Sequence, residues 1–392
     1  MNVLDGLLIV AALLSGLVGF RHGLIIAACS LVGFLGGAWV GLQAAPYVLS
    51  DAPRVFSTAV AALFVVLVVG AVGSMIGTLT GRHVRQLMTW RPGRLLDSTA
   101  GALVGIAYVL VFAWAMGVAV ASSGLPAISA PVRGSAVLAA VDRALPEDTT
   151  SLFRSFTQLL DRSGFPAVFA PFNREPIAPV EPPVVDESVT PAVQQAAASV
   201  LRVGGNAVSC SSTLTGTGWV YADDVVVTNA HVVAGVDDPV VVDSAGQTLR
   251  ARLVTFDAEI DIAVLRVDGL DAPALPFGGE LGAGDPATVI GYPGGGPLRF
   301  EPARVRTQQT IVGPDIYGGD RVTRDVYSVR TSVLPGDSGG PLLSPEGLVV
   351  GVIFAASLED DDTGYALTAA QVAPVLESSA QAVDPVSSGP CA

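Results

Sequence analysis

The chain has 392 residues, of which 51% are hydrophobic and 14% are charged, and its mean hydropathy of +0.57 is too high for a wholly soluble protein of this size. The formal net charge is −14, but residues 1–122 hold six arginines against three acidic residues, whereas residues 123–392 hold 15 against 32. Because an acidic part repels phosphate groups, nucleic acid is excluded as the expected partner.

Four uncharged, apolar stretches in the N-terminal part predict membrane-spanning helices. They cover residues 6–20, 24–49, 55–79 and 98–120, and about 20 residues are needed to cross the hydrocarbon core of a bilayer. The first stretch is short, so an interfacial segment is its alternative. We therefore expect residues 1–122 to form a four-helix transmembrane domain in contact with the lipid bilayer.

The arginines predict how this domain is oriented. Arg21 follows the first stretch, and Arg82, Arg85, Arg91 and Arg94 separate the third stretch from the fourth. Loops rich in positive charge face the cytoplasm. Both ends of the chain, and everything after the fourth stretch, are therefore expected outside the cytoplasm.

Glycine pairs at four-residue spacing predict close approach between the helices. The pairs are Gly37 with Gly41, Gly73 with Gly77, and Gly101 with Gly105. Close approach serves either a compact bundle within one chain or self-association of several chains. Asp5 and Asp97 lie near the ends of stretches, where we expect them at the membrane interface, with a functional polar site in the membrane as the alternative.

Three short motifs in this part carry a family resemblance. They are Leu4-Asp5-Gly6, Phe20-Arg21-His22-Gly23 and Arg94-Leu95-Leu96-Asp97. With these motifs the part resembles the colicin V production family of small membrane proteins. The resemblance implies an integral membrane module and transfers no functional residue.

Residues 123–190 are expected to link two domains. Segments 135–145 and 149–160 can each form a short amphipathic helix, the first with Leu138 and Val141 at helical spacing. Prolines recur between residues 171 and 190 among acidic and apolar residues without a helical period, which predicts an extended segment.

Short strand-like segments separated by glycine-rich turns follow from residue 191 onward, and they predict barrels or sandwiches. The segments are 225–228, 248–255, 262–267, 287–290, 303–310, 322–331 and 348–354. A helix at 369–380 is expected to end the domain.

Ser338 lies in the segment Gly336-Asp337-Ser338-Gly339-Gly340-Pro341. A serine hydroxyl that attacks a carbonyl carbon needs a neighbouring base and backbone N–H groups that stabilise the resulting oxyanion. The glycines permit a tight turn in which the N–H groups of Gly336 and Ser338 point to one spot. The segment predicts a nucleophile with its oxyanion hole; a surface turn, which these residue types also favour, is the alternative.

Two upstream residues complete a catalytic triad with this serine. His231 follows a β-branched segment and is the one histidine outside the arginine-bearing turns of the membrane part. We assign it as the base, with a hydrogen-bonded core histidine as the alternative. Asp261 opens an apolar segment and would orient the imidazole; an ordinary turn residue is its alternative, and Asp257 and Glu259 are rivals for the role.

Three segments carry a second family resemblance: TNAHVV, DIAVL and GDSGGP. Their spacing separates His231 from Asp261 by 30 residues, and Asp261 from Ser338 by 77 residues. With these segments the chain resembles the chymotrypsin-like trypsin family in its short bacterial form. The resemblance implies an all-β double barrel with the active site between the barrels, here at residues 191–392. It assigns the same base, orienting residue and nucleophile, and the same two N–H groups as the oxyanion hole. No cofactor or metal is expected. The fold class is therefore multidomain: a transmembrane four-helix bundle, then a double β-barrel with a C-terminal helix.

The resemblance also assigns a substrate pocket. Its floor is Ser332, six residues before the nucleophile, and its wall is Phe354-Ala355-Ala356-Ser357. Because the floor is not acidic, we expect a small or apolar residue rather than Arg or Lys on the acyl side of the cleaved bond. For the acidic patch at 359–362 we favour a solvated loop over a binding site for basic substrate residues.

The cysteines predict one disulfide bond. Cys29 lies in the second stretch, where it is expected to pack, whereas Cys210 and Cys391 lie on the side predicted to be oxidising, where we expect them to pair. The bond would close a loop of about 180 residues and stabilise the fold by roughly 5 kcal/mol in the chain-entropy model. Two free thiols are the alternative.

Both modules in this order resemble the actinobacterial membrane-anchored periplasmic serine proteases of the acid-resistance (MarP) type. The resemblance implies an enzyme on the outer, periplasmic face of the inner membrane, with protein or peptide substrates in the cell envelope and a role in acid or oxidative stress. Two alternatives remain. The second domain could bind peptides without cutting them, or the membrane module could be a transport or secretion factor that the protease regulates.

Overall fold

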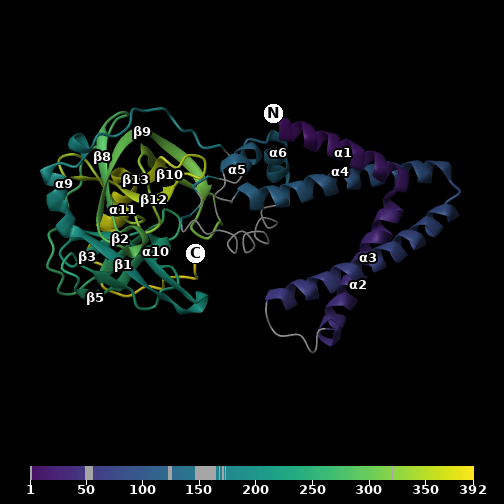
Figure 1. Cartoon of the computed structure of the whole chain (residues 1–392), viewed down its shortest axis with the longest axis horizontal. Helices are drawn as coiled ribbons and strands as arrows, with labels where there is room; N and C mark the ends of the chain where they lie inside the picture. The colour runs from purple at the N-terminus through teal and green to yellow at the C-terminus, as the bar shows by residue number, and fades with distance from the viewer. Residues whose placement is uncertain are drawn as a thin grey trace. The chain divides into compact units, whose positions relative to one another are not determined.

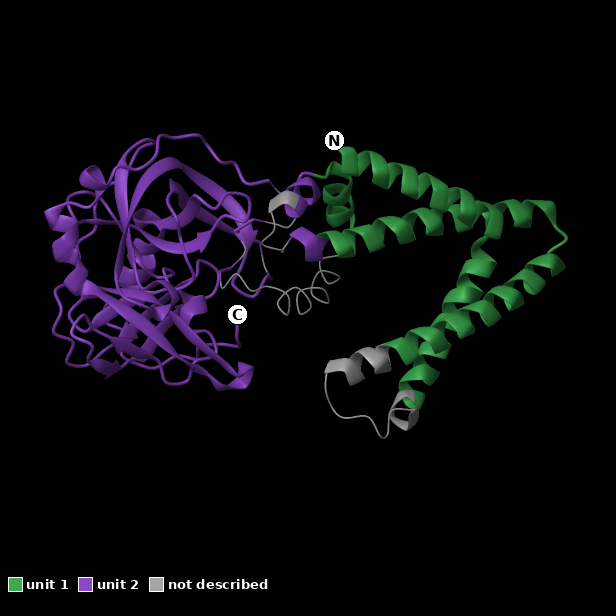
Figure 2. Cartoon of the chain, in the orientation of Figure 1, with its two compact units in different colours: residues 1–117, 135–145 green, residues 118–134, 146–392 purple. Residues whose placement is uncertain are grey.

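The structure is a computed structural model that describes residues 2–48, 56–121, 126–145, 165–166, 168–169, 172, 174–319 and 321–392. The chain divides into two compact units (Figure 2): Met1–Gly117 with Ser135–Leu145, and Val118–Gly134 with Pro146–Ala392. The predicted helix at 149–160 lies outside the described residues. The residue bounds predicted for the transmembrane, linker and protease segments remain a prediction.

In its described residues, the first unit contains four long helices, the last of which extends into the second unit, and one short helix (Figure 1). They are α1 (Val3–His22), α2 (Leu24–Val48), α3 (Phe56–Leu87), α4 (Arg91–Ala121) and α6 (Ala136–Ala144). The four long helices have the length and apolar composition needed to cross a membrane, which confirms the predicted number. The first helix has 20 residues and is therefore long enough to span.

Glycines allow these helices to approach closely as two antiparallel pairs. A side chain on Gly33 of α2 would collide with the backbone of Gly73 in α3, and one on Gly19 of α1 would collide with Gly101 of α4. Several of the glycines predicted to permit close approach are therefore used within the chain.

Two acidic residues of this unit, Asp5 and Asp97, hold helix ends. Asp97 accepts a hydrogen bond from the backbone N–H of Ile25 at 2.8 Å and pairs with Arg85 at 2.9 Å. Asp5 accepts from the Ser135 hydroxyl at 2.6 Å, just before α6. Both carboxylates thus have structural partners within the unit.

The second unit contains two curled sheets. In the first, seven strands lie in the order β5 (Thr248–Arg250), β4 (Val240–Val242), β1 (Val200–Ala207), β2 (Ser212–Ala222), β3 (Val225–Thr228), β7 (Ile262–Arg266) and β6 (Arg252–Asp257). The second sheet is a closed barrel in the order β10 (Arg321–Arg330), β13 (Thr363–Thr368), β12 (Val349–Ala356), β11 (Pro341–Leu343), β8 (Pro286–Gly291) and β9 (Arg299–Pro314).

Short helices surround the sheets. They are α5 (Pro126–Arg133), α8 (Val185–Ser188), α9 (Pro191–Ala196), α10 (Ala230–Val233) and α11 (Ala369–Ser379), with 3-10 turns η1 (Ala197–Ser199), η2 (Val208–Cys210) and η3 (Pro293–Gly295). The final helix, α11, begins where predicted, because the Thr368 hydroxyl caps it by accepting the N–H of Gln371 at 3.1 Å.

Burial alternates where a strand has one face in the core. In β10, Val322 and Val326 are buried, whereas Thr323 and Asp325 are exposed. One hydrophobic cluster includes Trp219 of the first sheet together with residues of the second, so the two sheets share a core. The predicted fold class is confirmed: four long apolar helices precede a β-rich domain of two curled sheets that ends in a helix.

Candidate active site

His231 and Asp261 are brought together where β3 ends and the neighbouring strand β7 begins. His231 lies in α10, directly after β3, and its Nδ1 is 2.7 Å from Oδ2 of Asp261. The other carboxylate oxygen accepts the backbone N–H of His231 at 2.9 Å. Asp261 is fully buried. One hydrogen bond orients the imidazole, with Nδ1 as the donor, and the other ties the carboxylate to the backbone of His231.

A tight turn between β6 and β7 positions Asp261. Its backbone has a φ of +63°, in the left-handed region that L-residues rarely adopt. The Asn229 side chain holds this conformation by donating to the Asp261 carbonyl at 2.7 Å. The rival Asp257 is engaged elsewhere, because its carboxylate accepts the N–H groups of Glu259 and Ile260, each at 3.0 Å.

Arg324 of β10, in the closed barrel, also supports this turn. The buried guanidinium donates to the carbonyl of Glu259 and, at 2.8 Å, to that of Pro314. Burial lowers the pKa of Arg324, and the nearby Asp261 opposes that shift. The turn that carries Asp261 is therefore held from the opposite sheet.

Both sheets hold the Ser338 turn. Thr217 of β2 donates its hydroxyl to the Gly336 carbonyl at 2.7 Å and its backbone N–H to the Ser338 carbonyl at 2.8 Å. From β12, Ile353 accepts the N–H of Gly339 at 2.8 Å. The φ values of +101° at Gly336 and +82° at Gly339 suit glycine alone.

Ser338 lies close to the segment that carries His231. A Cβ added to Gly339 would be 3.0 Å from the backbone nitrogen of Asn229. Among the described residues, neither Ser338 Oγ nor His231 Nε2 has a hydrogen-bond partner, although both atoms are buried. The N–H groups of Gly336 and Ser338 likewise have no acceptor within the part of the chain that is described. Such unsatisfied buried groups are rare, and they suit a site that awaits a substrate.

The neighbouring Asp337 points away from solvent. Its carboxylate accepts the N–H of Leu334 at 2.9 Å, and burial raises its pKa above the usual range. Asp337 closes the loop before Ser338, since the Leu334 carbonyl also accepts the N–H of Asp337 at 2.9 Å.

The residues assigned to the substrate pocket differ in exposure. Phe354 and Ala355 are fully buried, and Arg324 lies over the Phe354 ring at 6.0 Å from its centre. Ser332 and Ala356 are half-buried, so these two can contact a substrate side chain. The Ser332 carbonyl accepts a hydrogen bond from Arg299 at 2.6 Å.

The structure joins Cys210 and Cys391, as predicted, with their Cα atoms 6.4 Å apart. Cys391 lies against Gly235, shortly after His231. Within the described residues, no group of three or more His, Cys, Asp or Glu side chains is placed to hold a metal ion.

Sequence reasoning missed Thr217, Asn229 and Arg324. Thr217 had a signal that could have been used, because glycines flank it on both sides within a strand, at Gly216 and Gly218. Arg324 had none, since its role depends on a contact between sheets that are distant in the sequence.

Comparisons with known proteins agree with this geometry. Residues 216–352 match the trypsin-like peptidase domain, and residues 4–146 match the colicin V production protein family. The serine protease Rv3671c of Mycobacterium tuberculosis is 39% identical over 391 residues, which cover 99% of this chain and 98% of the relative. A probable periplasmic serine endoprotease, DegP-like, of Halomonas elongata is 35% identical over 145 residues, covering 35% of this chain and 28% of the relative.

A solved structure is also similar. The crystal structure of the Rv3671c protease from M. tuberculosis in its active form aligns with a TM-score of 0.54 at 42% identity, covering 57% of this chain and 99% of that one. This chain is therefore a serine protease and belongs to the family that joins a colicin V production-type helical module to a trypsin-like peptidase domain.

Proposed function

We propose that the chain is a membrane-tethered serine endopeptidase that cleaves proteins or peptides through an acyl-enzyme. The observation that carries the proposal is a pair of buried atoms without partners in the described residues, Ser338 Oγ and His231 Nε2, beside a carboxylate that orients the imidazole. Leaving such groups unpaired costs free energy, and a catalytic role accounts for that cost. Relatives described as endoproteases support cleavage within a polypeptide chain.

In the first half-reaction, His231 Nε2 takes the proton of the Ser338 hydroxyl while its oxygen bonds to the carbonyl carbon of the scissile peptide. The carbonyl oxygen takes up the electron pair, and the N–H groups of Gly336 and Ser338 donate hydrogen bonds to this oxyanion. When the tetrahedral intermediate collapses, the C–N bond breaks and the imidazolium gives its proton to the leaving amine. Water then attacks the acyl-enzyme with His231 as base, the ester bond breaks, and the serine regains its proton.

The half-buried Ser332 and Ala356 support a preference for small or apolar side chains on the acyl side of the cleaved bond. Neither residue offers a carboxylate to an Arg or Lys side chain. A panel of peptide p-nitroanilides that differ at this position tests the preference. A faster reaction with Arg than with Ala or Val would reverse it.

The arginines between the helices support an orientation with the protease outside the cytoplasm. In that orientation the enzyme is anchored in the inner membrane and acts on envelope proteins. The resemblance to acid-resistance proteases supports a role in acid or oxidative stress.

Self-association through the helices would need faces other than the glycine contacts between α2 and α3. Digestion of spheroplasts with an added protease should remove the second unit and spare the helices.

Labelling with a fluorophosphonate probe tests the chemistry. The full chain in detergent should be labelled and should cleave fluorescent casein, and Ser338→Ala should abolish both. Ser328→Ala is the matched control, because Ser328 is also a buried serine whose hydroxyl has no partner among the described residues; it should retain both. A folded wild-type chain that is not labelled would leave a peptide-binding domain as the better interpretation.

A further inference from the structure

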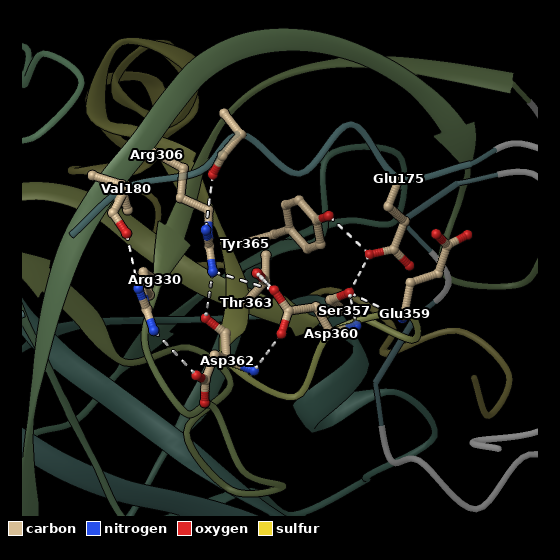
Figure 3. A network of polar contacts seen from close by, with 11 residues as sticks. Glu175, Val180, Arg306, Arg330, Ser357, Glu359, Asp360, Asp362, Thr363 and Tyr365 are labelled. Atoms are coloured by element: carbon tan, nitrogen blue, oxygen red, sulfur yellow. Dashed lines mark hydrogen bonds and ion pairs between the residues drawn. The ribbon is translucent and has the colours of Figure 1, made fainter. Parts of the chain in front are cut away.

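A segment upstream of the two sheets is docked onto the closed barrel. We call residues 174–182 the strap. Three of its carbonyl oxygens accept hydrogen bonds from arginines of β9 and β10 (Figure 3 shows two of them). The pairs are Arg306 to Ala178 at 2.8 Å, Arg330 to Val180 at 2.8 Å, and Arg304 to Pro182 at 3.3 Å. Residues 174–184 form no helix or strand, in line with the predicted extended segment at 171–190, but α8 interrupts that range at Val185–Ser188. The strap is bound to the barrel rather than free.

Two of these arginines also hold the loop that connects β12 to β13. We call residues 357–363 the wall loop. Arg306 pairs with Asp360 at 3.2 Å, and Arg330 lies 3.7 Å from Asp362. The sequence favoured a solvated acidic loop here, whereas two of its carboxylates are paired with arginines that also bind the strap.

Glu175 joins the strap to the wall loop directly (Figure 3). Its buried carboxylate accepts hydrogen bonds from the hydroxyl of Ser357, from the hydroxyl of Tyr365 at 2.9 Å, and from the backbone N–H of Leu358 at 3.0 Å. Burial, and then the charge of Glu175, raise the pKa of Tyr365, so this hydroxyl keeps its proton and donates it.

The Ser357 hydroxyl connects Glu175 to the backbone of the wall loop. While it donates to Glu175, its oxygen accepts the N–H groups of Glu359 at 3.1 Å and Asp360 at 3.0 Å. One carboxylate thus fixes the turn that presents Asp360 to Arg306.

Arg133 of α5 balances the charge of Glu175. Its Nη1 lies 3.3 Å from the carboxylate, and its Nη2 donates to the carbonyl of Ala121 at 2.7 Å. The Arg133 side chain is only 3% exposed. Burial lowers its pKa and the charge of Glu175 opposes that shift, so neither member of the pair is easily removed alone.

The wall loop is connected to the nucleophile turn through the strand before it, and to the pocket floor near its other end. It begins after β12, whose Ile353 accepts the N–H of Gly339. Near its other end, the carbonyl of Asp362 accepts the N–H of Thr331 at 3.0 Å. Thr331 directly precedes Ser332, the residue assigned to the pocket floor. A shift of the loop therefore moves the pocket floor and wall together.

From these contacts we propose that Glu175 is a positioning residue for substrate binding, which holds the wall loop and through it the pocket residues Ser332 and Ala356. The inference rests on the proposed function. It assigns part of the specificity of the enzyme to a residue outside the matched peptidase region, 216–352. Glu175 touches neither the substrate nor the reacting atoms.

The test is steady-state kinetics of the full chain with peptide p-nitroanilides, normalised to the sites labelled by the fluorophosphonate. Glu175→Gln keeps the size of the side chain, but its single oxygen cannot serve both hydroxyls, which share one carboxylate oxygen, and also the Leu358 N–H and Arg133, which share the other. We expect KM to rise about tenfold with kcat nearly unchanged, because ground-state positioning is lost while the reacting groups stay in place. Ser357→Ala should raise KM similarly, and combining the two should add little.

Two further variants separate positioning from stability. Glu175→Gln leaves Arg133 buried without a counter-charge, and Glu175→Gln with Arg133→Met removes that charge as well. We expect this double variant to regain thermal stability but to keep the raised KM. Glu187→Gln is the matched control, because Glu187 also pairs with a barrel arginine, Arg304, at 2.7 Å, without touching the wall loop; its KM should be that of the wild type.

The results discriminate between the two proposals. If KM returns to the wild-type value together with stability in the double variant, Glu175 is merely structural and this inference is overturned. The same holds if labelled Glu175→Gln has the wild-type KM. A wild-type chain that is not labelled at all would instead refute the proposed function.

Discussion

The hydroxyl of Thr217 is expected to affect kcat, although Thr217 is not a member of the triad, because it holds the backbone that presents the N–H groups of Gly336 and Ser338. It donates to the Gly336 carbonyl at 2.7 Å and accepts the backbone N–H of Tyr292 at 2.9 Å, and it is fully buried. Thr217→Val replaces it with a methyl group of similar size, so both partners lose a hydrogen bond in a place that water does not reach.

Each buried group left unpaired costs about 1–3 kcal/mol, so the folded second unit should lose about 3 kcal/mol. For a domain of this size, that corresponds to a fall in Tm of about 6–12 °C. The same change frees the backbone that presents the N–H groups of Gly336 and Ser338. We expect kcat to fall about 10- to 100-fold, less than the 100- to 1,000-fold typical of removing an oxyanion donor outright.

The assay is kcat per labelled site, measured well below the Tm of the variant, alongside thermal unfolding in detergent. Thr288→Val is the matched control, because Thr288 is also a buried strand threonine and donates its hydroxyl to the Ser188 carbonyl at 2.8 Å. It should lower Tm but leave kcat unchanged. If Thr217→Val lowers Tm and keeps the wild-type kcat, Thr217 does not hold the oxyanion hole.

Three other changes have defined outcomes. Asp261→Asn should lower kcat by about 10⁴-fold, because an amide favours the wrong imidazole tautomer; near-normal activity would mean that another carboxylate orients His231. Burial and then the charge of Glu175 raise the pKa of Glu359, so its ionised form destabilises the fold at neutral pH and protonation relieves this as the pH falls. Glu359→Gln should therefore raise Tm at pH 7 but not below about pH 4, near the unfolded pKa; an equal gain at both pH values would contradict this assignment. Replacing Cys210 and Cys391 together by serine should lower Tm measurably, since the bond joins residues 181 apart in the sequence; an unchanged Tm would show that the bond adds no stability.

Local patterns in the sequence predicted much of the fold. Uncharged stretches predicted the four long helices, and β3 lies at the predicted residues 225–228. The sequence did not reveal β1 and β2, because their glycines and threonines lack a clear alternation of polar and apolar residues. The predicted strand at 248–255 is two strands, β5 and β6, which break at Ala251.

The candidate site divides in a similar way. The contact between His231 and Asp261 could be predicted, because each residue lies in a short segment with a specific sequence pattern. The docking of the strap could not be predicted, since it depends on arginines that become neighbours only when β9 and β10 pair, with Arg304 opposite Arg330. A proline-rich segment indicates an extended backbone but does not indicate the surface on which it lies.

The attachment of the Ser338 turn to both sheets has a consequence for the activity of the chain during folding. Hydrogen bonds from Thr217 in one sheet and to Ile353 in the other shape this turn, and Arg324 reaches across in the opposite direction to the turn that carries Asp261. A half-folded chain, with one sheet formed and the other not, has neither turn in its final shape. Proteolytic activity is therefore expected only after both sheets have formed and packed against each other.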